Sequence, residues 1–437
     1  MARSRTRTLR PFSLTVVKAS DARAVRALLA PQQQRDVDTE RRVRTIVSDV
    51  RKGGDRALRS YASALDALEG PMEISLDEMR AEAARVPLDV RAAIRTAAQH
   101  IRTVARRQVP KSWRVRVAPG ITVEQRVRPL DRVGCYVPGG RYPLPSSLLM
   151  TAIPAIAAGV PDVIAVCPRP EPPVMAAALE AGVSRLFRIG GAHAVAAMAY
   201  GTATVPRVDK IVGPGNRWVA AAKALVTADC GIDFYAGPSE IVIVTTRGRA
   251  DWIAADLIAQ AEHDPDARAV LITPSAALAE RVVRAVRAQL PSSGPARAAL
   301  TAHGGIIVAA SRAEAIALAN AAAPEHLVVD DDATAAAIGC AGSIFVGPWS
   351  AQVAGDYALG SNHVLPTAGA ARVRGGLSAA DFVRQVTVQR VTRKGLSGIG
   401  PTVTTLAETE GLLAHAASVA RRLGRQTPTG ARNGKTG

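Results

Sequence analysis

The sequence predicts an α/β fold with two parallel-sheet lobes, preceded by a helical region and followed by a helical C-terminal segment. Of its 437 residues, 48% are apolar, which is near the average for globular proteins. After about residue 120, short β-branched runs alternate with alanine-rich helical stretches, as in βαβ units. The alternation occurs in two series, separated by a turn-forming cluster at 236–239. Two related α/β lobes are therefore expected.

The region from about residue 20 to residue 108 has a different pattern. Charged and apolar residues alternate there at helical spacing, for example over Leu88–Val104. No residues in this region suggest chemistry. We expect it to form a helical scaffold.

The first α/β series predicts strands at 132–137, 162–167 and 210–212, and helices at 146–158 and 218–227. Glycine-rich turns occur at 137–140, 189–192 and 212–216, each after an extended run and before a helix. Glycine allows the backbone to approach a phosphate, and a helix N-terminus favours its charge. None of the turns matches GxGxxG or the P-loop, and each alone is typical of a structural turn. Together they favour a nucleotide cleft.

The second series predicts strands at 240–245, 269–273 and 306–309 and helices at 251–262 and 277–290. Gln260 and His263 share a helix face near the end of one helix, which is weak evidence for metal; a capping hydrogen bond is the commoner role. Glu325 and His326 resemble an acid–base pair. Adjacent residues of a strand point to opposite faces, however, so both interpretations stay open for this pair.

Three further polar residues have no chemical role that spacing alone supports. Asp356 lies in a polar island that is typical of a hydrogen-bonded loop. Glu410 and His415 lie five residues apart in a helical stretch, not quite on one face. By pattern alone they are ordinary surface residues.

The net charge of +18 first suggests nucleic acid. Half of it lies in the arginine-rich segments 1–10 and 421–437, and Arg102–Arg116 adds another basic block. Aromatic residues make up only 3% of the chain, which argues against stacking platforms for bases. Nucleic acid is therefore unlikely beyond nonspecific contacts of the tails.

Other features favour a cytoplasmic enzyme. The four cysteines are far apart, so we expect buried, reduced thiols and no thiolate zinc site. The longest apolar run, Leu148–Cys167, is interrupted by prolines and an aspartate, so no membrane span is expected. We also expect no secretory signal.

Read together, six separated segments resemble the histidinol dehydrogenase family. They are, in order, GCYVPGG, VDKIVGPGN, AGPSE, IAQAEHDPD, APEHL and GDYALGSNHVLPT. The resemblance runs from about Val133 to His415, close to two thirds of the chain. A chance match of six such segments in the right order is implausible.

The resemblance implies two Rossmann-like but incomplete lobes and a C-terminal helical dimerisation arm that completes the site of the other subunit in a homodimer. It implies one Zn²⁺ per subunit and NAD, with L-histidinol oxidised to L-histidinaldehyde and then to L-histidine in histidine biosynthesis. The domains expected on this basis are an N-terminal arm (1–28), a helical scaffold packing with the catalytic lobe (29–128), an NAD-binding lobe (129–238), a zinc- and substrate-binding catalytic lobe (239–385), and a C-terminal helical arm with a basic tail (386–437).

The family's functional residues are carried over by motif position. The resemblance implies that Glu325 activates water and that His326 takes the alcohol proton. It implies zinc ligands at Gln260, His263, Asp356 and His415. These four, with Ser239, His326 and Glu410, would bind substrate.

The same resemblance implies NAD contacts from Tyr136, His193 and Asn216. His193 stands where the family motif usually has glutamine. It loses the amide's simultaneous donor and acceptor. We therefore expect His193 to alter the affinity for NAD or the preference between cofactors.

Two alternatives differ in class from the leading hypothesis. A zinc-dependent NAD dehydrogenase of the same family could act on another amino alcohol or on a sulfonated diol, although Glu410 would repel an anionic substrate. A basic nucleic-acid-binding protein could retain the fold, with the arginine-rich tails as its best support.

Overall fold

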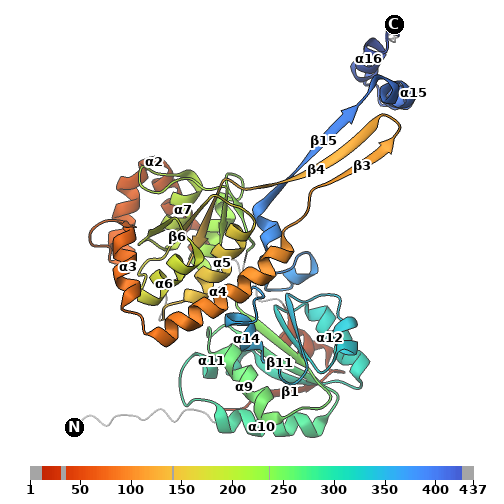
Figure 1. The fold of residues 1–437 in the computed structure, drawn as a ribbon. Helices are drawn as coiled ribbons and strands as arrows, with labels where there is room; N and C mark the ends of the chain where they lie inside the picture. The colour runs from red at the N-terminus through yellow and green to blue at the C-terminus, as the bar shows by residue number, and fades with distance from the viewer. Residues whose placement is uncertain (1–11, 31–35, 140–141, 236, 426–437) are drawn as a thin grey trace, which may run out of the picture. The chain divides into compact units, whose positions relative to one another are not determined.

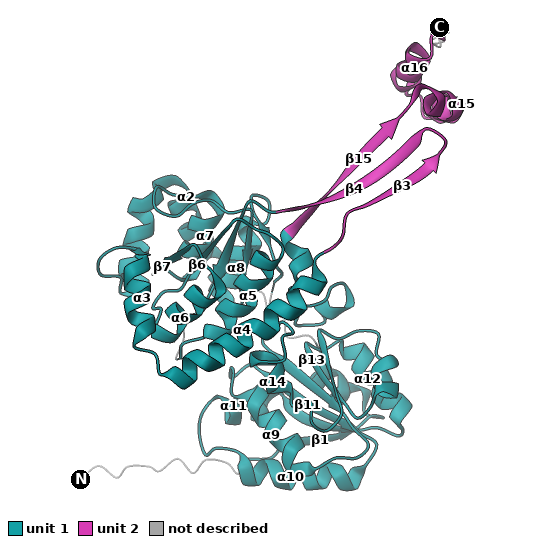
Figure 2. Cartoon of the chain, in the orientation of Figure 1, with its two compact units in different colours: residues 1–109, 130–382 teal, residues 110–129, 383–437 magenta. Residues whose placement is uncertain are grey.

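The computed structural model describes residues 12–30, 36–139, 142–235 and 237–425. The chain divides into two compact units, drawn in different colours in Figure 2. One unit contains residues 1–109 and 130–382, and the other contains residues 110–129 and 383–437. The first unit holds the two predicted lobes, each built on a six-stranded sheet (Figure 1).

The first lobe has a sheet of strand order β2-β7-β6-β5-β8-β9. All neighbours are parallel except β2 and β7. The chain moves from β5 towards β7 and then returns to β8 beside β5, which creates a switch point of the Rossmann type. The strands are β2 (Glu73–Ile74), β5 (Arg132–Tyr136), β6 (Asp162–Val166), β7 (Arg185–Phe187), β8 (Lys210–Val212) and β9 (Gly231–Ile232). The connecting helices are α5 (Pro145–Ala157), α6 (Pro172–Ala181), α7 (Gly191–Tyr200) and α8 (Arg217–Val226).

The N-terminal helices were expected to pack with the catalytic lobe; they mainly cover the first lobe, and α4 also contacts the second lobe, where Nδ1 of His100 lies 2.7 Å from the carbonyl of Ala358. They are α2 (Val37–Asp66), α3 (Leu76–Ala84) and α4 (Leu88–Gln108). Helix α2 packs on α7 and α8, and α3 and α4 pack on α5 and α6 (Figure 1). The apolar stripe of α2, which includes Val43, Val47 and Leu58, joins the same buried cluster as Phe187 and Met198. The alanine-rich helices of the first lobe allow this close approach.

The second lobe repeats the strand order of the first, except that its edge strand β1 is parallel to its neighbour where β2 is antiparallel. Its strand order is β1-β12-β11-β10-β13-β14, and all neighbours are parallel. Apolar clusters cover both faces of this sheet, as parallel sheets require. The strands are β1 (Thr15–Lys18), β10 (Glu240–Val244), β11 (Arg268–Thr273), β12 (Gly304–Val308), β13 (His326–Val329) and β14 (Ser343–Val346). The helices are α1 (Ala22–Leu29), α9 (Ala250–Ala261), α10 (Ala276–Gln289), α11 (Pro295–His303), α12 (Arg312–Ala322), α13 (Asp332–Ala336) and α14 (Gln352–Tyr357).

The segment expected as an N-terminal arm is in part a strand of the second sheet. Residues 15–18 form β1, which pairs in parallel with β12 at the edge of that sheet. The second lobe is therefore assembled from two distant parts of the chain.

The second unit is an antiparallel sheet followed by two helices. Its strands β3 (Trp113–Ala118), β4 (Ile121–Pro129) and β15 (Val383–Val391) have the order β15-β4-β3 and precede α15 (Arg393–Thr409) and α16 (Leu413–Arg422). The C-terminal segment was expected to be mostly helical, so β15 is a correction. On this sheet Arg126, Arg390 and Arg114 hydrogen-bond the Glu124 carboxylate and lower its pKa to about 2. Part of the Arg102–Arg116 block is therefore structural.

Two sequence expectations concern membranes and thiols. Among the described residues, no helix is both long and apolar enough to span a bilayer. All four cysteines are free, and Cys135, Cys167 and Cys230 are buried. Burial raises the pKa of each of these three thiols to about 12, so they are unreactive. The segments 1–10 and 426–437 and the loop residue Arg141 lie outside the described residues.

Candidate active site

The predicted catalytic pair lies at the amino-terminal edge of the second sheet. Glu325 directly precedes β13, and His326 is its first residue; both are 4% exposed. The backbone of Glu240, the first residue of β10, contacts both. Its N–H donates to Oε2 of Glu325 at 2.8 Å, and its carbonyl accepts from Nδ1 of His326 at 3.2 Å. One neighbouring residue therefore fixes the orientation of both side chains.

These contacts determine how His326 can act. A carbonyl oxygen only accepts, so Nδ1 carries the hydrogen and Nε2 is the acceptor of the neutral ring. Nε2 is buried without a hydrogen-bond partner in the described chain, at 3.6 Å from Oδ1 of Asp356. Burial lowers the pKa of His326, but the carboxylates of Glu325 and Asp356 outweigh it and raise the pKa to about 9. At neutral pH the ring is therefore protonated while the Asp356 carboxylate faces it, and Nε2 becomes a proton acceptor when a cation bound to Asp356 offsets that carboxylate.

Asp356 is brought to the catalytic pair by the short helix α14. Its Oδ2 accepts from Nε2 of Gln352 at 2.7 Å, and its backbone carbonyl accepts from Nδ1 of His363 at 3.0 Å. Burial raises the pKa of Asp356, but contact with His326 and the charges of His363 and His263 lower it overall. The carboxylate is thus ionised and held in one orientation.

The helix-end pair Gln260 and His263 contributes a second group of polar atoms. Gln260 lies in the last turn of α9 and is fully buried, yet neither its Oε1 nor its Nε2 has a partner among the described residues. His263 is exposed and its Nδ1 lies 3.2 Å from the carbonyl of Gln260. A buried amide with no partner is costly, and this cost is removed when a ligand binds.

The side chains of this region include donors that suit a metal ion. Within the described residues, no three His, Cys, Asp or Glu side chains come together in a way that would hold one. The unpartnered Oε1 of Gln260, the imidazole of His263 and the ionised Asp356 nevertheless supply the oxygen and nitrogen donors that Zn²⁺ accepts. The first unit holds three of the four predicted ligands, and the fourth, His415, belongs to the second unit.

The remaining substrate-site residues are distributed over both units. Ser239 is partly buried immediately before β10, beside Glu240. Glu410 ends α15 and His415 lies in α16, and both are exposed on the second unit. Ser239 is therefore the neighbour of Glu240, the residue that orients the catalytic pair. Glu410 and His415 belong to the other unit, and no contact within the first unit includes them.

The predicted NAD contacts lie at the carboxyl-terminal edge of the first sheet. Tyr136 ends β5 and is buried; its hydroxyl accepts from the N–H of Gly191 at 3.0 Å. Asn216 caps α8, where its Oδ1 accepts from two backbone N–H groups. Its side chain is exposed, so its amide N–H₂ can face a ligand.

His193 is placed differently from Asn216. It is fully buried in the first turn of α7, and its Nε2 lies 2.8 Å from Oδ2 of Asp66. The same Oδ2 accepts from the N–H of Gly190. His193 thus braces the glycine turn from inside, and a direct contact with NAD stays a prediction.

A cavity of about 190 Å³ opens at the same edge of the first sheet. It lies beyond the carboxyl ends of β5 and β6, which is where dinucleotides bind in open α/β sheets. Arg169 and Glu171 give it both charges. Its other lining residues are Pro138, Gly139, Tyr142, Pro143, Cys167 and Val174.

Several residues at these sites were not singled out from the sequence. Gln352 orients Asp356, Asp66 holds the turn at Gly190, and Lys223 and Asp233 form a buried ion pair. A signal existed for Lys223, because it is the one charge inside the alanine-rich run Trp218–Val226. A lone charge in a buried helix indicates a partner.

Comparison with known proteins agrees with this geometry. The profile of the histidinol dehydrogenase family matches residues 29–423. The histidinol dehydrogenase of Halobacterium salinarum is 48% identical over 392 residues, which cover 87% of this chain and 92% of that protein. The histidinol dehydrogenase of Pseudomonas aeruginosa is 43% identical over 431 residues, which cover 94% of this chain and 98% of that protein.

A solved structure resembles the fold over the same extent. The crystal structure of histidinol dehydrogenase from Elizabethkingia anophelis superimposes with a TM-score of 0.90 at 33% identity. The match covers 94% of this chain and 98% of that one. The chain therefore belongs to the histidinol dehydrogenase family of NAD-dependent oxidoreductases.

Proposed function

We propose that this protein oxidises L-histidinol to L-histidinaldehyde and then to L-histidine, as part of histidine biosynthesis in the cytoplasm, with NAD⁺ as the acceptor in both steps. The observations that carry the proposal are two sets of unpartnered buried atoms: Nε2 of His326, which lies 3.6 Å from the ionised Asp356, and the amide of Gln260 on α9, the helix that packs on the Asp356-bearing α14. Such atoms call for a ligand that offers both a proton to transfer and groups to coordinate.

Gln260, His263, Asp356 and His415 would hold one Zn²⁺ per subunit. When bound, this redox-inert ion supplies a Lewis acid that orients the imidazole and amino groups of the substrate, while NAD⁺ accepts the electrons. Gln352 keeps Asp356 in place for this role through the 2.7 Å bond to Oδ2.

In the first step, Nε2 of His326 would take the proton of the alcohol hydroxyl, while NAD⁺, when bound, would supply the acceptor for the hydride of the alcohol carbon. The bond from Nδ1 to the carbonyl of Glu240 keeps Nε2 as the accepting atom. The neighbouring Glu325 carboxylate stabilises the imidazolium that forms, because Oε2 lies 3.5 Å from Nδ1.

In the second step, the aldehyde adds water before it can give another hydride. Glu325 would remove a proton from that water, and the imidazolium of His326 would return its proton to the aldehyde oxygen, which gives the gem-diol. With a second NAD⁺ bound as hydride acceptor, His326 would take the hydroxyl proton of the gem-diol, and the product would leave as the carboxylic acid. The position of Glu325 supports this role, since the N–H of Glu240 holds its Oε2 at 2.8 Å beside His326.

We propose that Glu410 and His415 reach the site in a homodimer. Both are exposed on the second unit, and Leu406, Leu412 and Leu413 nearby are also exposed. Burial of these leucines against a second copy would be favourable. Glu410 then suits the ammonium group of the substrate, which favours histidinol over a sulfonated diol.

A stoichiometry measurement tests the proposed function. The zinc-loaded protein should form two NADH per L-histidinol in a single turnover, and chelation of the metal should abolish the reaction. Glu325→Gln should form the first NADH but slow the second by about 10²-fold or more. The proposal is wrong if the wild-type protein reduces no NAD⁺ with L-histidinol, or prefers a sulfonated diol or another amino alcohol.

A further inference from the structure

The turn between β8 and α8, residues 213–216, begins with a backbone conformation and a close contact that only glycine allows. Gly213 has φ of +119°, and a Cβ at this position would lie 2.2 Å from the carbonyl oxygen of Tyr136. No side chain fits there, so the turn lies directly against the end of β5. A small shift of Gly213 would therefore move the turn relative to Tyr136.

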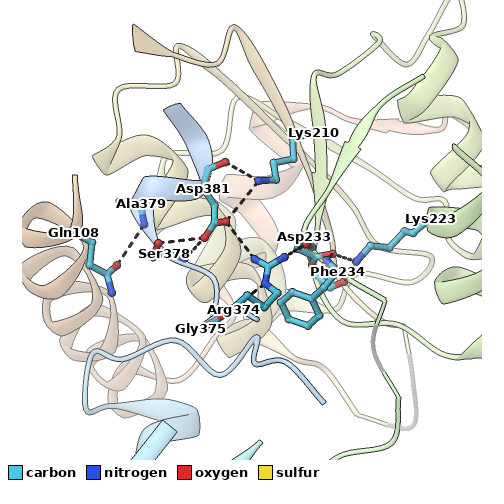
Figure 3. Close-up of polar contacts among 11 residues, drawn as sticks. Gln108, Lys210, Lys223, Asp233, Phe234, Arg374, Gly375, Ser378, Ala379 and Asp381 are labelled. Carbon is cyan, nitrogen blue, oxygen red and sulfur yellow. Dashed lines mark hydrogen bonds and ion pairs between the residues drawn. The ribbon is translucent and has the colours of Figure 1, made fainter. Parts of the chain in front are cut away.

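A buried ion pair holds both polar backbone groups of Gly213. The Nζ of Lys223 donates to the Gly213 carbonyl at 3.0 Å, and Oδ2 of Asp233 accepts from the Gly213 N–H at 2.8 Å. Lys223 and Asp233 also form an ion pair with each other, and their side chains are 4% and 1% exposed. Figure 3 shows Lys223 reaching Asp233 from α8. The two charges thus close around one glycine.

Asp233 is itself fixed by the neighbouring chain. Its Oδ1 accepts from the N–H of Phe234, and its carbonyl accepts from the guanidinium of Arg374. That guanidinium lies 4.6 Å from the centre of the Phe234 ring and also pairs with Asp381 at 3.2 Å (Figure 3). The anchor for Gly213 therefore belongs to a connected network and cannot shift alone.

Stability alone is a poor reason for such an arrangement. Two buried charges lose their hydration, and a well-packed apolar pair is often as stable or more stable. Here the charges are directed at the N–H and C=O of a single turn residue, so their specific effect is to set its position. Asn216 pins the other end of the turn by capping α8.

We propose that Lys223 and Asp233 are positioning residues for the dinucleotide: they hold Gly213 so that the turn and the N-terminus of α8 stand ready for the cofactor. This inference rests on the proposed function, specifically on NAD binding at this edge of the first sheet. Neither residue touches the reacting atoms. Their effect is expected on cofactor affinity, with the substrate site unaffected.

The test separates positioning from folding by removing one charge or both. Lys223→Met and Asp233→Asn each leave an unpaired buried charge and should strongly destabilise the fold. The double variant Lys223→Met/Asp233→Asn carries neither charge and should recover most of the lost stability. It should still raise KM for NAD⁺ roughly tenfold to a hundredfold. Its KM for L-histidinol should stay within about twofold of wild type.

A matched control removes another ion pair from the same sheet. Glu73 and Arg185 join β2 and β7 through two hydrogen bonds at the sheet edge. Glu73→Gln/Arg185→Met should change stability without changing KM for NAD⁺. NAD⁺ affinity is also measured by titration without histidinol, so that binding is read independently of turnover.

The outcomes separate a failure of the positioning role of Lys223 and Asp233 from a failure of the proposed function. Wild-type protein that turns over histidinol, together with a stable double variant whose NAD⁺ affinity is unchanged, overturns the positioning role only. An equal loss of NAD⁺ affinity in the Glu73/Arg185 control also overturns it, since the effect would then be general. Wild-type protein without NAD⁺ reduction on L-histidinol overturns the proposed function itself.

Discussion

The two lobes share one strand order but carry their candidate sites at opposite edges of the sheet. In the first lobe the glycine turns follow the strands, at the carboxyl edge, where Gly190 and Gly213 come after β7 and β8. In the second lobe Glu325 and His326 stand where β13 begins, at the amino edge. Ligands of open α/β sheets are expected beyond the carboxyl ends, so only the first lobe follows that rule.

The helix ends explain what each edge can bind. The N-termini of α7 and α8 lie at the carboxyl edge of the first sheet, and helix N-termini carry partial positive charge that favours phosphate. The C-termini of α9 and α12 precede strands of the second sheet, at its amino edge. Their partial negative charge favours cations. The helix ends therefore favour anions at the carboxyl edge of the first sheet and cations at the amino edge of the second, in agreement with the sites proposed above for NAD⁺ and for the ammonium group of histidinol.

The two edges also differ in how well their polar groups are satisfied. In the first lobe Asp66 and Asp233 bind the backbone of the glycine turns, although Nδ1 of His193 has no partner in the described chain. In the second lobe the unpartnered atoms belong to Gln260, His326 and Gln352. The first edge is preorganised by the protein itself, whereas the second becomes complete only with its ligands.

The largest expected effect comes from removing the base of the second lobe. His326→Ala should lower kcat by about 10² to 10⁴-fold, because proton removal from the alcohol is lost. NAD⁺ affinity, measured by titration, should stay unchanged, since the cofactor edge belongs to the other lobe. A loss of NAD⁺ affinity equal to the loss of kcat would contradict the division of labour between the lobes.

Gln260→Leu should have opposite effects on two properties. Loss of the amide oxygen should weaken zinc binding by about 10- to 100-fold, measured by competition with a chelator. The metal-free protein should become more stable to urea by roughly 1 kcal/mol, because a buried unpartnered amide is replaced by an apolar group. Gln289→Leu, at an exposed glutamine bonded to the carbonyl of Asp251, is the control and should change neither.

Competition experiments with fragments of the two ligands test whether the first lobe binds the anionic cofactor and the second lobe the cationic substrate. ADP carries the phosphates and should compete with NAD⁺ but not with histidinol. Histamine carries an imidazole and an ammonium group and should compete with histidinol but not with NAD⁺. For a fragment with a dissociation constant of about 1 mM, the apparent KM of its competitor doubles at that concentration. A crossed pattern of inhibition would show that the edges have been assigned to the wrong ligands.

The smallest effect concerns Asp256, one turn before Gln260 on α9. Burial raises its pKa from 3.8 to about 6. The unfolded chain then ionises at lower pH than the folded one, so the free energy of unfolding should fall as pH rises from about 4 to about 6. Asp256→Asn should remove this dependence and gain about 1 kcal/mol at pH 7, after allowance for partial exposure. At pH 4 the variant and the wild type should unfold alike; a gain of equal size there would mean that the effect is not electrostatic.

Local pattern was enough to predict most elements of both lobes. The strand at Lys210–Val212 has the bounds expected from its β-branched run, and the helices near 146–158 and 251–262 shift by only a residue or so. These elements are continuous in sequence and strongly patterned. The two-lobe fold class follows from their alternation and is confirmed.

Features that depend on contact between distant segments were not predicted. The helices of 37–108 cover the first lobe because their apolar stripes match its alanine-rich helices, and no local pattern specifies that partner. The strand β15 was missed because the valines of Val383–Val391 are spaced three, two and three residues apart, which is not the strict alternation of a half-buried strand. The contact of Glu240 with both Glu325 and His326 follows from the pairing of β10 with β13, which the sequence does not display.

The pairing of β1 with β12 has a consequence for synthesis on the ribosome. About 290 residues separate Lys18 from its neighbours in β12, and the whole first lobe lies between them. At about 5 to 20 residues per second, β1 therefore waits roughly 15 to 60 seconds for its partner to emerge. During that time the first lobe can fold, while Val16 and Val17 remain an unpaired strand. Nascent chains should thus acquire protease resistance in the first lobe before any in the second.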